Sequence, residues 1–229
     1  MRCAYKRGVG YRKRYSSNSW TTKRLALIVA NKQKNKLGNQ MHTPIFSNTL
    51  FICVDIQERL IGAMADSEGV LKNSQILINS AHILGSKILV SEQYIKGLGK
   101  TDKKLLDSLE SLDSHQVQFF EKTTFSIFND KEITLALNEH KKNGIQKLIF
   151  FGIEAHVCIF QSVLHALECG YDVWIVGDCV SSRNEANCLN AKSLMSQLGA
   201  KITNTESVVF GSIVDSKDTN FKALSNLIK

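Results

Sequence analysis

The sequence predicts a doubly wound α/β domain, and three observations support this fold class. Short apolar runs alternate with longer amphipathic stretches from residue 49 onward. The runs lack the polar alternation of half-exposed strands, which is typical of strands buried on both faces of a parallel sheet. Glycines follow several of the amphipathic stretches, at positions where helices would end.

The predicted buried strands are short segments rich in apolar and β-branched side chains. They are residues 49–54, 87–91, 147–151 and 172–176, with the sequences TLFICV, KILVS, KLIFF and DVWIV. Residues 116–119 and 201–203 are weaker strand candidates. The stretches between the strands are predicted helices, at residues 69–85, 102–111, 130–142, 157–169, 184–198 and 217–228. Gly144, Gly170 and Gly199 fall where three of these helices would be capped.

Length and composition fit one sizeable globular domain. The chain has 229 residues, of which 43% are hydrophobic and 22% charged. No apolar run approaches the roughly 18 residues that cross a bilayer, so we expect no membrane insertion. The six cysteines show no C-x-x-C spacing. We therefore expect no zinc site, and reduced thiols in an intracellular compartment.

The net charge of +8 is a property of the N-terminal segment. Residues 1–45 contain eleven Lys and Arg and no Asp or Glu, so the remaining 18 basic residues are outnumbered by 21 acidic ones. We expect residues 1–45 to form a disordered basic tail and residues 46–229 to form the domain. The tail resembles a mitochondrial transit peptide. The alternatives are a solvated tail on a cytoplasmic protein and translation from Met41. We expect nucleic acid to bind only nonspecifically, through this tail.

Three chemically useful side chains follow predicted strands, at the edge where doubly wound sheets place their sites. Asp55 follows the first strand, Lys122 the third and Cys158 the fourth. A cysteine at a helix start has a lowered pKa, a carboxylate can accept its proton, and a lysine can orient that carboxylate. The alternatives are an inert buried cysteine, an N-capping aspartate and a surface lysine.

Five segments together resemble the isochorismatase-like hydrolases, most closely their isochorismatase-domain-containing branch. They are VDIQERL (54–60), SEQYIKGLG (91–99), EKTTFSIF (121–128), FGIEAHVCIFQSVL (151–164) and VGDCVSSR (176–183). The resemblance covers about residues 47–215. It implies a three-layer αβα sandwich with a mostly parallel, Rossmann-like sheet. It also implies that Cys158 attacks a carbonyl carbon, with Asp55 as general base and Lys122 positioning Asp55 and the substrate.

The resemblance also implies the surroundings of the nucleophile. A cis peptide is expected at Ile153–Glu154, and the amides of Glu154 and Cys158 are expected to bind the oxyanion. The implied reaction is hydrolysis of a small amide or related carbonyl compound through a covalent intermediate, without a cofactor. A homo-oligomer is expected. The alternative is a catalytically silent binding or scaffold protein that keeps the fold.

The sequence departs from the nicotinamidases of this superfamily at one place. Their Asp-x-His metal-binding segment is replaced here by Ser91-Glu-Gln-Tyr-Ile95, so we expect no metal site. Glu92, Gln93 and Tyr94 could line the substrate pocket instead, although Gln93 could equally form loop hydrogen bonds. Phe125 and Phe128 are expected to supply an apolar pocket wall.

Three further polar residues lie near these motifs, and we favour structural roles for each of them. His156 is close to Cys158 in sequence, but neighbouring residues at a turn seldom face each other. For Asp178 and Arg183 we favour loop hydrogen bonds or a subunit contact.

Overall fold

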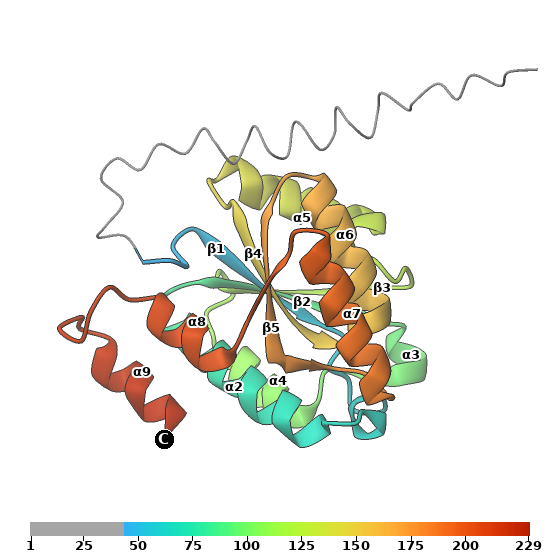
Figure 1. Cartoon of the computed structure of the whole chain (residues 1–229), viewed down its shortest axis with the longest axis horizontal. Helices are drawn as coiled ribbons and strands as arrows, with labels where there is room; N and C mark the ends of the chain where they lie inside the picture. The colour runs from blue at the N-terminus through green and yellow to red at the C-terminus, as the bar shows by residue number, and fades with distance from the viewer. Residues whose placement is uncertain (1–43) are drawn as a thin grey trace, which may run out of the picture. The chain divides into compact units, whose positions relative to one another are not determined.

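A fully parallel, six-stranded sheet forms the centre of the computed structural model, which describes residues 44–229 (Figure 1). The predicted tail over residues 1–45 therefore lies almost entirely outside the described residues. The order of the strands in the sheet is β3-β2-β1-β4-β5-β6. The strands are β1 (Thr49–Val54), β2 (Lys87–Gln93), β3 (Val117–Lys122), β4 (Lys147–Ile153), β5 (Asp172–Ser181) and β6 (Lys201–Thr203).

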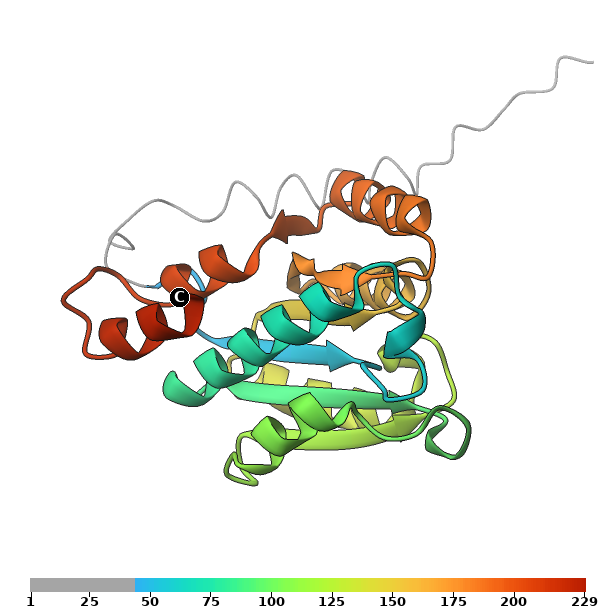
Figure 2. The same ribbon diagram turned by 90° about the horizontal axis from the view of Figure 1, so that it is seen from below.

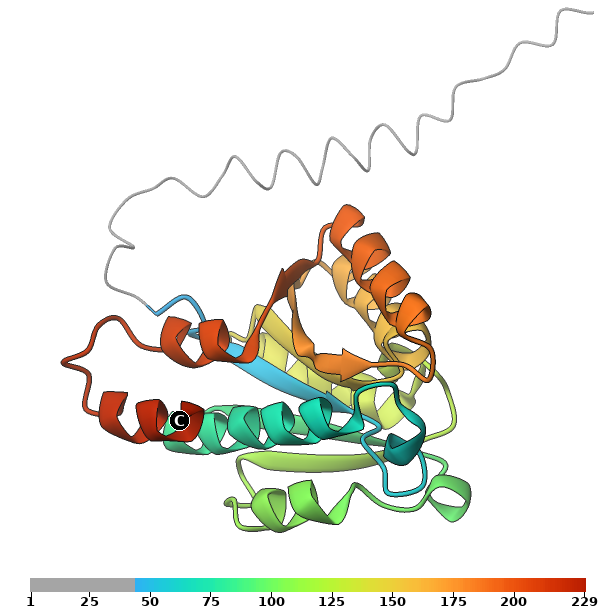
Figure 3. The same cartoon turned by 60° about the horizontal axis from the view of Figure 1, so that its bottom comes forward.

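Helices cover both faces of the sheet, which confirms the three-layer sandwich (Figure 1). On one face lie α2 (Ser67–Ile83), α4 (Lys103–Glu110) and α8 (Thr205–Gly211). On the other lie α5 (Lys131–Lys142), α6 (Phe160–Glu168) and α7 (Glu185–Gln197). The helix α9 (Phe221–Ile228) packs with α8 beside α2, at the end away from the strand tips (Figure 3). Within residues 44–229, no helix is long and apolar enough to cross a membrane.

Successive side chains of β1 point to opposite faces of the sheet, and both faces are apolar cores, so the sequence of the strand is a continuous apolar run. Leu50, Ile52 and Val54 belong to the core beneath α5, α6 and α7. Phe51 and Cys53 belong to the opposite core, beneath α2 and α4. Every residue of β1 is buried, because helices cover both faces of the sheet.

Most of the predicted elements are present, with differences mainly at their ends. The bounds of β1 and β6 agree with prediction, whereas β2, β4 and β5 run further toward their C-terminal ends. Gly144, Gly170 and Gly199 follow α5, α6 and α7 with positive φ angles, as predicted for helix caps. The prediction omitted α8, the short helix α3 (Ile95–Leu98) and the 3-10 turns η1 (Ile61–Ala63) and η2 (Ile127–Asn129). The three shortest elements lack a full amphipathic period to detect.

The order of the strands creates a switch point between β1 and β4. The chain proceeds from β1 outward to β2 and β3, and then returns to place β4 on the other side of β1. The connections that leave β1 and β4 therefore lead to α2 and α6 on opposite faces of the sheet, and α/β sheets place their ligand sites beside such a switch point. In Figure 2 the arrowhead of β1 points to this end, where η1 and α3 also lie. Residues that directly follow β1 and β4 are thereby placed next to each other.

Gly152 allows β4 to approach β1 at this switch point. Its φ angle is +123°, and a Cβ atom at this position would collide with the carbonyl of Val54. We predict that Gly152→Ala lowers the free energy of unfolding by at least about 2 kcal/mol. Denaturant unfolding measures this, with Gly62→Ala as control because a Cβ atom added to Gly62 would meet no atom within 4 Å. Equal stability of the two variants would contradict the proposed close approach.

Candidate active site

Asp55 is the first residue after β1, and its carboxylate is held from two sides. It has a left-handed φ of 53° and is fully buried. The hydroxyl of Ser91, at the matching level of β2, donates to Oδ1 at 2.7 Å. The ammonium of Lys122 donates to Oδ2 at 2.7 Å. A buried carboxylate with a cation and a hydroxyl donor meets the requirement that buried charges be paired.

Lys122 is the last residue of β3, rather than a residue after the strand, and its ammonium is surrounded by acceptors. Nζ donates to Asp55 Oδ2, to Gln93 Oε1 at 2.7 Å and to the carbonyl of Thr124 at 3.2 Å. These three acceptors match the three donors of a charged ammonium. Nζ also lies 3.8 Å from Cys158 Sγ, so the same cation faces both the carboxylate and the thiol.

Cys158 lies in a turn of π-helix, η3 (Ala155–Ile159), which connects β4 to α6. The prediction placed it at the start of an α-helix; instead, α6 begins only at Phe160. In the π-turn, the amides of Val157 and Ile159 both donate to the carbonyl of Glu154, at 3.0 and 3.3 Å. Isolated π-turns are frequent at functional sites. Only 7% of Cys158 is exposed, so its thiol faces Asp55 and Lys122 rather than bulk solvent.

Glu154 links this turn to the loop after β5. The peptide bond between Ile153 and Glu154 is cis, at the position that the family resemblance implies. The buried Glu154 carboxylate accepts hydrogen bonds from the Arg183 amide at 3.0 Å and from Arg183 Nε at 3.2 Å. Arg183 therefore has the loop contacts that we favoured for it.

The protonation of the site differs from the sequence-based expectation. Burial raises the pKa of the Asp55 carboxyl, although the charge and hydrogen bond of Lys122 oppose this effect. Burial and the neighbouring charge of Asp55 also raise the pKa of the Cys158 thiol, against the opposing charge of Lys122. The expectation of a lowered thiol pKa was wrong, because Cys158 lies in a buried turn beside a carboxylate.

Of the predicted pocket residues, Tyr94 and Phe125 are exposed near the strand ends, whereas the others have partners inside the protein. Tyr94 and Phe125 flank the strand ends with 50% and 53% of their surfaces exposed. Gln93 contacts Lys122 and donates to the carbonyl of Thr123 at 2.8 Å, in line with the loop hydrogen-bond alternative. The Phe128 ring instead packs near His165 and Tyr171, which does not support a place in the pocket wall. Glu92 is buried and accepts hydrogen bonds from Thr101.

His156 and Asp178 have partners away from the thiol. Nδ1 of His156 lies 2.9 Å from the hydroxyl of Ser182. The Asp178 carboxylate accepts from the amide and the hydroxyl of Thr205, at 2.9 and 3.0 Å. These contacts support the structural roles that we favoured for both residues.

Sequence reasoning missed two buried polar residues that organise the site. Ser91 binds Asp55, and Gln57 cross-links the loops around Gln93. The available signals were a polar residue inside an apolar strand for Ser91 and a polar residue in the loop after β1 for Gln57. Within residues 44–229, no group of three or more His, Cys, Asp or Glu side chains is arranged to hold a metal ion.

The isochorismatase domain family matches residues 49–207, which contain Asp55, Lys122 and Cys158. The chain belongs to the isochorismatase family. It is 37% identical over 183 residues to isochorismatase family protein 1B of Dictyostelium discoideum, covering 80% of this chain and 86% of that protein. It is 34% identical over 207 residues to isochorismatase domain-containing protein 1 of Danio rerio, covering 90% of this chain and 68% of that protein.

A solved structure of similar fold carries the name MAR1 ribonuclease and comes from Caenorhabditis elegans. It is 33% identical in sequence, has a TM-score of 0.73, and covers 81% of this chain and 91% of its own. The family match and the isochorismatase domain-containing relatives confirm the resemblance to the isochorismatase-like superfamily and its domain-containing branch. Membership of the isochorismatase-like hydrolases supports hydrolysis as the general class of activity.

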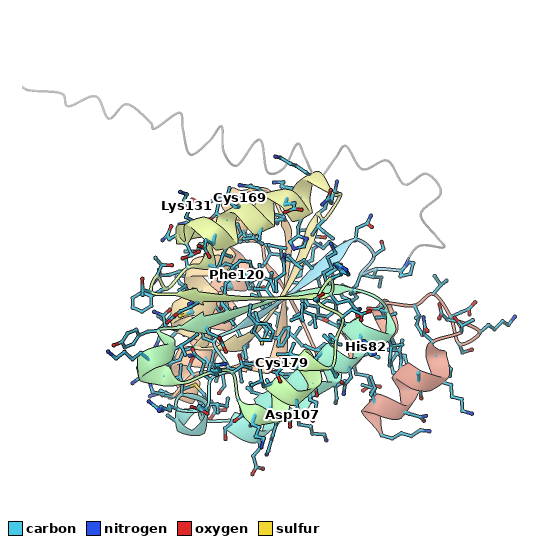
Figure 4. All side chains as sticks on the ribbon, turned by 180° about the vertical axis from the view of Figure 1, so that it is seen from behind. His82, Asp107, Phe120, Lys131, Cys169 and Cys179 are labelled. Atoms are coloured by element: carbon cyan, nitrogen blue, oxygen red, sulfur yellow. The ribbon has the colours of Figure 1, made fainter. Side chains whose placement is uncertain are left out.

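The raised pKa of Cys158 leads to a prediction about thiol labelling. Cys169 is exposed at the surface near α5, whereas Cys158 is buried (Figure 4 labels Cys169). We predict that iodoacetamide at neutral pH modifies Cys169 before Cys158, because only thiolates react. Peptide mass spectrometry of a labelling time course measures the two rates. Faster modification of Cys158 would show that its thiol is already ionised in the free protein.

Proposed function

We propose that the protein is a cysteine hydrolase that acts on a small amide or related carbonyl compound, with Asp55, Lys122 and Cys158 as its catalytic residues. The observation that carries this proposal is the contact of one ammonium with both other groups. Lys122 Nζ lies 2.7 Å from Asp55 Oδ2 and 3.8 Å from Cys158 Sγ, at the switch point of the sheet. Chain segments far apart in sequence thereby place a nucleophile, a base and a cation together.

The raised pKa values of Asp55 and Cys158 define the first step. Cys158 keeps its proton in the free protein, and ionised Asp55 accepts that proton as the sulfur attacks the substrate carbonyl carbon. The carbonyl π electrons move to oxygen and form a tetrahedral oxyanion. When the oxyanion collapses, the C–N bond breaks, and the leaving nitrogen takes the proton from Asp55. The product that remains on Cys158 is a thioester.

Water completes the reaction. Asp55, again ionised, accepts a proton from a water molecule that attacks the thioester carbonyl carbon. Collapse of the second tetrahedral intermediate breaks the C–S bond, and the thiolate regains its proton from Asp55. The carboxylic acid leaves and the free protein is restored. Throughout the cycle, the Lys122 charge stabilises whichever neighbour is anionic, carboxylate or thiolate.

The backbone of the turn can stabilise the oxyanion. The Val157 and Ile159 amides are bound to the Glu154 carbonyl, which holds the turn around Cys158 in a fixed conformation. We assign the Glu154 and Cys158 amides to the oxyanion, as the resemblance to the isochorismatase-like hydrolases implies; Glu154 directly precedes the π-turn and Cys158 carries the sulfur. Donors fixed before the reaction stabilise developing charge without reorganisation.

Removal of the sulfur is the direct test of this proposal. Cys158→Ala should lower kcat/KM for the best amide in a metabolite screen by at least about 1000-fold, because the covalent path is lost. Cys169→Ala, which removes an exposed thiol, should retain wild-type kcat/KM and is the control. Undiminished turnover by Cys158→Ala would contradict the proposal. Complete inactivity of the wild type across the screen, with small molecules still bound, would favour the scaffold alternative.

The name of the Caenorhabditis elegans relative brings a second substrate class into the same screen. RNA should be included, with Cys158→Ala and Asp55→Asn as variants. RNA cleavage that both variants retain would exclude a reaction at the triad of Asp55, Lys122 and Cys158. It would indicate either a different site on this chain or a contaminating nuclease.

The protonation of Asp55 gives the reaction a defined pH dependence. Asp55 must be ionised to accept the thiol proton, and burial raises its pKa above the ordinary value of about 3.9. The acid limb of kcat/KM should therefore lie above pH about 4, with activity lost as the pH falls through the raised pKa. A pH–rate profile measures this limb, and Asp55→Asn should remove it together with most of the activity. A limb at or below the ordinary aspartate value would contradict the assigned base.

A further inference from the structure

The side-chain amide of Gln93 is bound at both of its ends. Nε2 donates to the carbonyl of Thr123 at 2.8 Å, and Oε1 accepts from Lys122 Nζ at 2.7 Å. Because a carbonyl must face a donor and an ammonium must face an acceptor, these two contacts allow only one orientation of the amide. Gln93 thus presents an oxygen to Lys122 and cannot rotate its NH₂ group into that position without losing both bonds.

The backbone of Gln93 is held by a second glutamine. Gln57 is fully buried, and its Oε1 accepts from the Gln93 amide at 2.7 Å. Its Nε2 donates back to the Gln93 carbonyl at 3.0 Å and also to the carbonyl of Gly99. Gln57 follows β1, Gln93 ends β2 and Lys122 ends β3. The two amides therefore join three adjacent strand ends at the catalytic edge of the sheet.

Lys122 needs such a support because of its chemistry. A lysine ammonium is a compact charge on a flexible stem with three rotatable donors. Its two closest acceptors are Asp55 Oδ2 and Gln93 Oε1, both at 2.7 Å, whereas the Thr124 carbonyl lies at 3.2 Å and Cys158 Sγ at 3.8 Å. Without the Gln93 oxygen, the buried ammonium would lose one of its two closest acceptors, which favours movement of Nζ toward another acceptor or water.

We propose that Gln93 is a positioning residue, whose amide oxygen holds the Lys122 ammonium between Asp55 and Cys158, and that Gln57 holds Gln93. This inference rests on the proposed function of the triad. It assigns no substrate contact to Gln93, which distinguishes it from a residue of the pocket wall.

Steady-state kinetics with two matched variants separates positioning from substrate binding. Gln93→Leu keeps the approximate size but removes the acceptor, so kcat should fall about 10- to 100-fold with little change in KM. Gln93→Glu keeps an acceptor oxygen and should recover part of kcat. Gln75→Leu makes the same chemical change at an exposed position of α2 and should behave as wild type.

The pH profile of Gln93→Glu provides a readout that a packing role would not change. Lys122 from β3, Ser91 from β2 and Cys158 from η3 face the Asp55 carboxylate. A second carboxylate at position 93 would compete for Lys122, so the acid limb of kcat/KM should move to higher pH. A raised KM with an unmoved limb in both variants would overturn the proposal and make Gln93 a substrate-binding residue. Wild-type kinetics in both would overturn it as well.

Labelling of Cys158 tests the same inference without any turnover. In Gln93→Leu, the thiolate form of Cys158 would lose the fixed cation that stabilises it, so less of this form would be present. Iodoacetamide should therefore modify Cys158 about tenfold more slowly than in wild type at the same pH. Thermal unfolding verifies that each variant is folded, and Gln75→Leu is again the control. Unchanged labelling in a folded Gln93→Leu would overturn the positioning role. Turnover retained by Cys158→Ala would instead contradict the proposed function. The labelling rates would still decide separately whether Gln93 positions Lys122.

Discussion

The ion pair between Lys122 and Asp55 is the interaction on which the rest of the site depends. Both side chains are almost completely buried, with 1% and 0% of their surfaces exposed, and their charged atoms lie 2.7 Å apart. Removing two charges from water is costly, and loss of one partner would leave the other charge buried and uncompensated. Ser91 also donates to Asp55, and Lys122 also donates to Gln93 and to the carbonyl of Thr124, which completes the pairing of both groups. Folding of this edge of the sheet therefore depends on the ion pair, and the ion pair also supplies the charges of the site.

The topology of the sheet is what brings the pair together with Cys158. Asp55 and the π-turn follow the two strands that flank the switch point, while Lys122 reaches in from β3. Gly152 permits the close contact of β1 and β4 on which this arrangement depends. The turn η3 holds the thiol in a buried position beside the ion pair. Burial and the charge of Asp55 raise the pKa of the Cys158 thiol, so in the proposed reaction its proton must move as the sulfur attacks.

The sequence was sufficient to predict the layers of the fold and the positions of the three central side chains. Buried strands such as β1 are recognisable as continuous apolar runs, because helices bury the side chains on both faces of the sheet. The glycines after α5, α6 and α7 marked helix ends, because a positive φ angle at a helix cap favours glycine at that single position. Phe128, by contrast, belongs to interior packing with Tyr171, and nothing local distinguishes such a phenylalanine from one at a pocket. The hydrogen bonds that link Gln93 with Gln57 and with Lys122 join residues far apart in sequence, which local patterns do not encode.

We infer that the charge of the free site resides on Asp55 and Lys122, while Cys158 remains a thiol. An ultraviolet titration of thiolate absorbance, taken as the difference between the wild type and Cys158→Ala, tests this distribution of charge. We expect no difference at neutral pH, and the appearance of one thiolate only at a pH above the ordinary cysteine pKa of about 8.5. A full thiolate difference at neutral pH would contradict it, because Cys158 would then carry the charge that we assign to Asp55.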